Sequence, residues 1–311
     1  MESPQSLAIS PTNDLPDPDI GSIGSAGLAG RPPRRDNLLR TLGRQRLAVA
    51  GGTIVVLFAL MALFGPFLAP YDPLDQDVPN RLAAPGWSHW MGTDEFGRDV
   101  FSRLLSGAGI SFQVGVVSVG LSGIVGVVFG LIAGYFRGRA DAGISLVMDV
   151  IFAFPTILLA LSLVAVLGSS LTNVMLAIGI VNAPTFYRVV RGSVLSVRQS
   201  LYVEAAVSVG TPVATIMRRH IFPNITAPLI VHASLNFAAA VLAEAALSYL
   251  GLGNRPPSPS WGLMVSSAYG FLEQAPWATL FPGIAIALIV LGFNLLGDGL
   301  RDALDPRLRG R

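Results

Sequence analysis

The sequence predicts an all-α membrane protein with six membrane-spanning helices. Two observations support this fold class. Of the 311 residues, 52% are hydrophobic and only 13% are charged, whereas soluble domains contain about a quarter charged residues. The apolar residues also come in blocks, and about 20 residues is the length that a helix needs to cross a bilayer.

Two residue types are missing from the chain. All 21 basic residues are Arg and none is Lys, which excludes a P-loop with its phosphate-binding Lys. If ATP hydrolysis through such a loop drives the work of this protein, another chain must carry the loop. The sequence also contains no Cys, which excludes disulfides, thiolate nucleophiles and Cys-bound metals.

The elements follow in chain order from the apolar blocks. Residues 1–36 are rich in Pro, Ser, Gly and Asp without apolar periodicity, which is typical of a disordered tail. Residues 37–70 contain the N-terminal segment and the first span. Asn182 and Pro184 interrupt the fourth span, which is tolerable where a helix lines a cavity or packs against neighbours. The six predicted spans are 47–69, 110–136, 145–167, 171–190, 225–250 and 279–298.

The Arg residues predict the orientation in the membrane. With the N-terminus inside, 17 Arg lie in inner segments and four lie outside: Arg81, Arg98, Arg103 and Arg255. Because inner loops carry the excess of Arg and Lys, we expect the tails 1–36 and 301–311 and the segment 191–224 in the cytoplasm. The segment 71–109 is then an external loop. The Pro-rich segment 251–278 is also external, and is a candidate seat for a delivering protein.

Glycines recur at four-residue spacing in the second span, at Gly126, Gly130 and Gly134. Small residues at this spacing let two helix backbones approach closely. The pattern fits packing within the chain at least as well as an interface between subunits.

A short segment between the fourth and fifth spans has a distinct pattern. Two helical pieces meet at a break, because Gly210 can end one helix and Pro212 suits the first turn of the next. Arg218 and Arg219 leave the helical face that is formed by Val213, Ile216, Met217 and His220. A rigid amphipathic helix-turn-helix on the inner side predicts a docking surface for a partner. A basic loop lying on lipid headgroups is the alternative.

This segment resembles the Glu-Ala-Ala loop of permease subunits of bacterial ABC importers, and in particular the second-type permease of the peptide/nickel branch. The matching positions are Glu204, Ala205, Ala206, Gly210 and Pro223, with His220 and Phe222 at the family's Ile and Leu positions. Gly109 departs from the family, in which an Arg is common there. Five further stretches fit the same branch: 91–103, 153–155, 250–253, 256–262 and 297–307.

The resemblance implies a type I ABC importer permease fold, with 110–300 as the permease domain and 202–223 as the coupling helix region. The residues implied to contact an ATPase are Glu204, Ala205, Ala206, Gly210, Arg218, Arg219 and Pro223. The implied partners are a homologous permease, two cytoplasmic ABC ATPases, an extracytoplasmic binding protein and the lipid of a bacterial inner membrane, but no nucleic acid. The chain itself would hold no cofactor, metal or catalytic residue, since ATP and Mg²⁺ bind the ATPases.

Polar residues inside the spans are costly in lipid and therefore face protein or a watery path. Asn182, Asn236 and Glu244 are the candidates for lining a translocation route, and His232 and Asp149 also lie within or near spans. Asp149 lies near the inner end of its span and Glu244 near an outer end, so either side chain could snorkel or cap a helix instead.

The implied function is ATP-driven import of di- or oligopeptides, with nickel chelates as the alternative cargo. A different class, an intramembrane serine protease, rests on Gly120-Leu121-Ser122-Gly123 with His232 as the base. That reading leaves the segment 191–224 without a purpose. A channel or secondary transporter acting alone would need no ATPase, and the sequence shows no inverted repeat.

Overall fold

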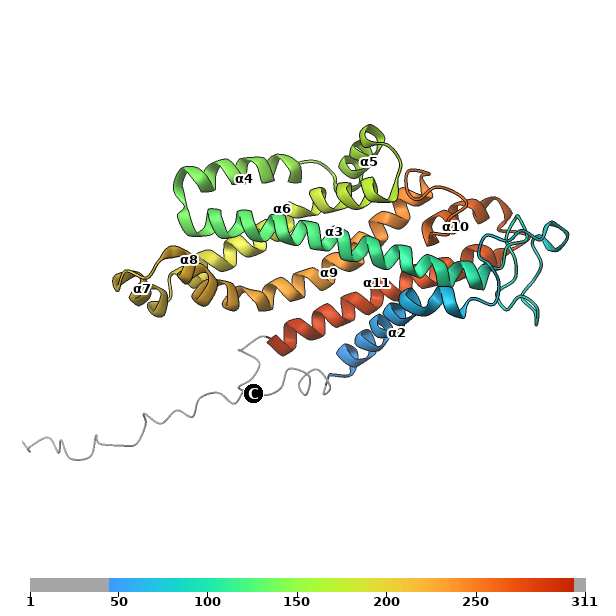
Figure 1. Cartoon of the computed structure of the whole chain (residues 1–311), viewed down its shortest axis with the longest axis horizontal. Coiled ribbons are helices and arrows are strands. Elements are labelled where there is room, and N and C mark those ends of the chain that lie inside the picture. Colours follow the sequence, from blue (N-terminus) through green and yellow to red (C-terminus); the bar gives the residue numbers. More distant parts are fainter. Residues whose placement is uncertain (1–44, 305–311) are drawn as a thin grey trace, which may run out of the picture. The chain divides into compact units, whose positions relative to one another are not determined.

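A computed structural model describes residues 45–304, and the elements assigned within this range are helices (Figure 1). Five helices are long and apolar enough to cross a membrane, or six when one bent pair counts as a span. This confirms the predicted all-α membrane fold. The predicted tail 1–36 and residues 305–311 lie outside the described residues. The long helices are α2 (Arg46–Leu68), α3 (Val100–Phe136), α6 (Leu171–Arg198), α9 (Phe222–Tyr249) and α11 (Pro276–Leu304).

Helix α3 begins at Val100, well before the predicted start of the second span at residue 110. Asp99 caps this helix, since its carboxylate accepts hydrogen bonds from the Ser102 backbone N–H at 2.8 Å and from the Ser102 hydroxyl at 2.7 Å. The first turns contain Ser102 and Arg103, which are polar but buried. Hydropathy therefore assigned the start of a helix to the external loop.

The predicted third span, 145–167, is not a single helix. The chain there forms α4 (Gly138–Phe152) and α5 (Thr156–Leu167), which are bent by 89° relative to each other. Pro155 explains the break, because it has no backbone N–H to donate and its ring disfavours helical backbone at Phe154.

Helix α6 continues through Asn182 and Pro184, where the sequence suggested an interruption. Pro184 is buried, and the Thr185 hydroxyl donates a hydrogen bond of 2.7 Å to the carbonyl of Asn182. Packing and a side-chain donor are the conditions under which a membrane helix tolerates proline.

The glycine stripe of α3 packs against α6. A Cβ atom added to Gly126 would lie 2.7 Å from the backbone nitrogen of Tyr187, and one added to Gly130 would lie 2.8 Å from Cβ of Val190. Gly134 is in the same relation to Val194. The contact partners belong to the same chain, so these glycines serve packing within the subunit.

The loop between α2 and α3 folds around buried charges at the end of the bundle that also holds α10 (Trp261–Ala268) (Figure 1). Arg98 Nε lies 2.7 Å from an Asp94 oxygen, and its Nη2 lies 3.3 Å from Glu95. Arg103 lies 3.4 Å from Asp94. Arg98, Asp94 and Arg103 are all buried. The predicted loop 251–278 thus contains a helix, and Trp261 of that helix donates to the Leu104 carbonyl at 2.9 Å.

Replacing Arg98 by methionine is expected to destabilise this end of the protein by about 3 kcal/mol, because it removes the partner of Glu95 and the shorter of the two ion pairs of the buried Asp94. Thermal unfolding of the detergent-purified protein measures the loss. Arg255→Met is the control, since Arg255 is exposed and, among residues 45–304, its side chain bonds only Ser169; it is expected to cost less than about 1 kcal/mol. Equal shifts in the two variants would contradict the role of the buried pairs.

Candidate functional site

The segment between α6 and α9 folds as an elbow, residues 201–223. Its first helix, α7 (Leu201–Ser208), ends at a Schellman turn, in which Gly210 has a φ of +75°. The N–H of Gly210 donates to the Val207 carbonyl and the N–H of Thr211 to the Ala206 carbonyl, each at 3.0 Å. The predicted break at Gly210 is confirmed. Pro212 lies one position earlier than expected, at the N-cap of α8 (Val213–Ile216).

The second half of the elbow is continuous with a membrane span. Helix α8 passes through a π-helical turn, Met217–Ile221, directly into α9, so that Val213–Tyr249 forms one helix of membrane-spanning length. The wide turn precedes Pro223, which has no N–H to donate to the preceding turn. Next to this proline, the side-chain amide of Asn224 donates a hydrogen bond of 2.6 Å to the backbone carbonyl of His220. Any displacement of this half of the elbow is therefore carried into α9.

One face of the elbow packs on the body of the protein. Val203, Ala206, Ile216 and Ile221 are buried in a cluster; the cluster also contains Tyr135 of α3 and Val190, Val194 and Ile225 of α6 and α9. This burial fixes the orientation of both short helices.

The opposite face of the elbow is exposed and partly apolar. Leu201 and Val209 are 83% and 81% exposed, and Val207 is 54% exposed. Clustered apolar side chains with this exposure indicate a surface that is covered by a partner protein or by the membrane. Both short helices lie at the end of the bundle opposite α10 (Figure 1).

Six of the seven predicted docking residues lie on the exposed surface: Glu204, Ala205, Gly210, Arg218, Arg219 and Pro223. The seventh, Ala206, is buried against the body. Beside α7 lies a cavity of about 360 Å³ whose lining includes Glu204, Arg137 and Arg198. The elbow thus presents a small, mixed apolar and charged surface around Gly210.

The three predicted pathway residues lie in different surroundings. Asn182 is half-buried on α6. Glu244 is completely buried, and the Ser248 hydroxyl donates to it at 2.6 Å. Asn236 is buried, and its amide nitrogen lies 2.9 Å from Nε2 of His232. In the part of the chain that the structure describes, no hydrogen bond joins the three side chains to one another.

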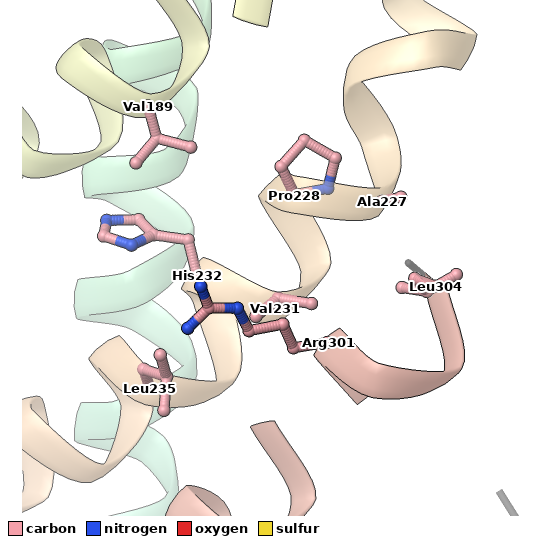
Figure 2. Close-up of a pocket in the computed structure, with 8 residues that line it drawn as sticks. All are labelled: Val189, Ala227, Pro228, Val231, His232, Leu235, Arg301 and Leu304. Atoms are coloured by element: carbon pink, nitrogen blue, oxygen red, sulfur yellow. The ribbon is translucent and has the colours of Figure 1, made fainter. Parts of the chain in front are cut away.

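His232 lines a cavity of about 510 Å³ between α6, α9 and α11. Figure 2 shows Arg301 of α11 extending towards α9 on the side where His232 and Val231 lie. The other lining residues are mostly apolar. Asn236 adjoins this cavity through His232, whereas Glu244 is enclosed by protein.

A seam of ion pairs between α4 and α6 was not predicted. Arg191 donates two hydrogen bonds to Asp141, at 2.6 and 2.7 Å, and Arg188 donates one to Asp149 at 2.9 Å. The sequence-based orientation assigns Arg188 to an inner segment, but in the structure Arg188 lies within α6, which extends to Arg198. A usable pattern was present, because Asp141, Ser145 and Asp149 recur at four-residue spacing on one helical face.

Ser122 and His232, the residues behind the protease alternative, have separate partners. The Ser122 hydroxyl donates to the Ser118 carbonyl of its own helix at 2.9 Å. The His232 ring lies against Phe186 and beside Asn236. Within residues 45–304 no hydrogen bond joins Ser122 to His232, so the base that a serine nucleophile needs is not in place.

Known proteins match most of the chain. Residues 126–310 match the family model for the binding-protein-dependent transport system inner membrane component, and residues 36–85 match that for the N-terminal TM domain of oligopeptide transport permease C. A chain from the structure of the MetNI methionine ABC transporter in inward facing conformations superimposes with a TM-score of 0.54 at 17% identity, covering 65% of this chain and 97% of that one. That likeness shows the fold.

Three curated relatives are closely similar in sequence. The dipeptide transport system permease protein DppC of Alkalihalophilus pseudofirmus is 47% identical over 87% of this chain and 89% of its own length. The glutathione transport system permease protein GsiD of Pectobacterium atrosepticum is 44% identical over 91% and 97%. The probable D,D-dipeptide transport system permease protein DdpC of Escherichia coli K12 is 44% identical over 85% and 89%. The relatives are transport subunits rather than enzymes, and the chain belongs to the family of binding-protein-dependent transport system inner membrane components.

Proposed function

We propose that the chain is the permease subunit of an ATP-driven importer of di- or oligopeptides in a bacterial inner membrane. The observation that carries the proposal is the elbow, a partly apolar exposed surface joined rigidly to a membrane span. The three relatives are named for peptide cargo, which favours peptides over the nickel chelates that the sequence left open. The excess of Arg in the inner segments supports cytoplasmic termini.

In this proposal the elbow sits in a groove of a separate ABC ATPase. Glu204, Ala205 and Gly210 form the surface of close approach, and Arg218 and Arg219 make charged contacts at its rim. ATP and Mg²⁺ bind the ATPase, which favours one of two arrangements of the spans by contacting the elbow differently in each. Because α8 and α9 form one helix, the bias reaches the span without a flexible joint.

The complete importer also contains a homologous permease, a second ATPase and an extracytoplasmic binding protein. The permease pair encloses the route, of which this chain forms half. Asn182, Asn236 and Glu244 remain the predicted pathway residues, and Asn236 has the best support because it adjoins the cavity lined by His232.

Uptake by the assembled complex in liposomes tests the proposal. We expect a labelled dipeptide to accumulate only when ATP is supplied to the ATPase subunits, and nickel chelates to accumulate much less. Transport without an ATPase would contradict the function. The orientation is tested separately with the variant Ala205→Cys. Its new Cys is the only thiol of this chain, because the natural sequence has no Cys. Labelling of this thiol from the external side would contradict a cytoplasmic elbow.

A further inference from the structure

The two ion pairs of the seam between α4 and α6 differ in how open they are. In the closed pair, Asp141 and Arg191, the side chains are 17% and 34% exposed, and Ser145 also donates to Asp141. In the open pair, Asp149 and Arg188, they are 58% and 46% exposed. Within residues 45–304 the open pair is joined by one hydrogen bond, of 2.9 Å, and neither side chain has another.

On α3 and α4, the other exposed side chains at the depth of the open pair are apolar. On α4 these are Leu146, Val147 and Val150, each more than half exposed. On α3, Gly126 and Gly130 contact α6 at residues 186–190, which is the level of Arg188. The residues of α3 that are exposed between these two glycines, Val128 and Phe129, are also apolar.

Val147, on the opposite side of α4 from Asp149, and Val128 and Phe129 of α3 indicate that lipid reaches this level on other faces of the bundle. Charged side chains inside a membrane face a partner group or a water-filled space and not lipid. Asp149 and Arg188 pair with each other but remain 58% and 46% exposed, so we infer that the rest of this face of α4 and α6 meets water or a polar ligand rather than lipid.

We propose that Asp149 and Arg188 line the cargo route and bind the charged ends of a peptide in transit; this inference rests on the proposed function. Every unmodified peptide carries an ammonium and a carboxylate, whatever its side chains. Asp149 accepts hydrogen bonds from the ammonium, and the guanidinium of Arg188, with four N–H donors not used in the pair, binds the carboxylate.

The exchange keeps charges compensated at every stage. Without cargo the two side chains neutralise each other, and with cargo each is neutralised by one end of the peptide. The guanidinium carbon of Arg188 lies 3.7 Å from the centre of the Phe152 ring, and this cation–π contact holds it while its partner changes. Since the intrachain pair competes with cargo, binding is weak enough for release, which a route requires.

The first test measures whether position 149 is accessible to water. Because the natural chain contains no Cys, a thiol reagent can label this chain only at the introduced Cys. Asp149→Cys and Val147→Cys are compared in the assembled complex with a charged, hydrophilic thiol reagent. Val147 is exposed and lies on the opposite side of α4. We expect the Asp149→Cys thiol to react at least about tenfold faster, because only that face meets water, and excess dipeptide to slow its reaction.

Equal rates at the two positions, or a rate at Asp149→Cys that dipeptide does not change, would overturn the assignment. A covering homologous permease is the competing occupant of this face. It predicts an unreactive thiol at Asp149→Cys.

Uptake of end-blocked dipeptides is the second test. The same binding protein delivers a free and a C-amidated dipeptide. In Arg188→Gln, uptake of the free dipeptide relative to the amidated one is expected to fall about tenfold, the effect of losing one charge-assisted contact to the carboxylate. The ratio of free to N-acetylated uptake is expected to fall similarly in Asp149→Asn. Asp141→Asn is the matched control, since it breaks the closed pair and should lower the yield of folded protein without changing either ratio.

Unchanged ratios in both Arg188→Gln and Asp149→Asn would overturn the inference while leaving peptide import intact. Failure of the wild-type complex to take up any dipeptide would instead reject the proposed function. In that case the reactivity of Asp149→Cys against Val147→Cys still decides whether this face meets water.

Discussion

Replacing Gly126 by leucine is expected to prevent formation of the folded permease. Even the Cβ atom of the new side chain would lie 2.7 Å from the backbone nitrogen of Tyr187 and would also overlap Cβ of Phe186. Because the clash is with the backbone of α6, a change of side-chain rotamers in α6 cannot relieve it. The two helices would have to separate along the stripe that continues through Gly130 and Gly134. Overpacking costs about 1–3 kcal/mol where neighbours can move, so we expect a loss above that range here.

The yield of monodisperse protein after detergent extraction measures this effect, together with thermal unfolding of the extracted fraction. Gly192→Leu and Gly143→Leu are the controls, because a Cβ at either helical glycine would meet no atom within 4 Å. Both controls are expected to fold, and replacing glycine within a helix removes a propensity penalty of about 1 kcal/mol. A Gly126→Leu protein as abundant and stable as the controls would show that α3 and α6 do not pack through this stripe.

The sequence predicts the fold well because membrane helices are marked by a property of single segments. A block of about 20 apolar residues is visible without knowing its neighbours, and the first span, 47–69, agrees with α2 at both ends within a residue. The same property fails where a helix continues beyond lipid. The starts of α3 at Val100 and of α10 at Trp261 depend on caps by Asp99 and Ser260 and on burial under the loop between α2 and α3.

The elbow was predictable in part, since Gly210 has the positive φ that its position at the end of α7 requires. The continuity of α8 with α9 was not, because Pro223 suggests a helix start unless a π-helical turn accommodates it. The pair of Asp149 and Arg188 was not predictable from either residue alone. The two side chains meet where α4, which ends before the bend at Pro155, packs on α6. Neither the bend nor this packing can be predicted from the composition of a single segment.

Replacing Gly210 by valine is expected to uncouple transport from ATP hydrolysis. The φ of +75° is unfavourable for a β-branched residue, so the Schellman turn would open and α7 would lose its fixed angle to α8. A Cβ at Gly210 would meet no atom within 4 Å, so the effect is conformational and the spans remain packed. Since coupling energies of about 1–3 kcal/mol correspond to roughly 5–150-fold, we expect dipeptide uptake to fall at least about tenfold while ATP hydrolysis continues.

The ratio of dipeptide transported to ATP hydrolysed measures coupling, and the amount of membrane-inserted permease must equal that of the wild type. Gly210→Asn is the matched control, because asparagine tolerates positive φ and should preserve the ratio. Glu204→Trp tests the same surface by bulk instead of backbone, and Glu204→Ala keeps it small, so the Trp variant should lose more transport. Uptake at the wild-type level in both Gly210→Val and Glu204→Trp would mean that the ATPase acts elsewhere on the chain. If Gly210→Asn keeps the ratio and Gly210→Val loses it, the cause is the backbone at this exposed position and not a steric clash. The fixed angle between α7 and α8 would then be what couples ATP hydrolysis to movement of the spans.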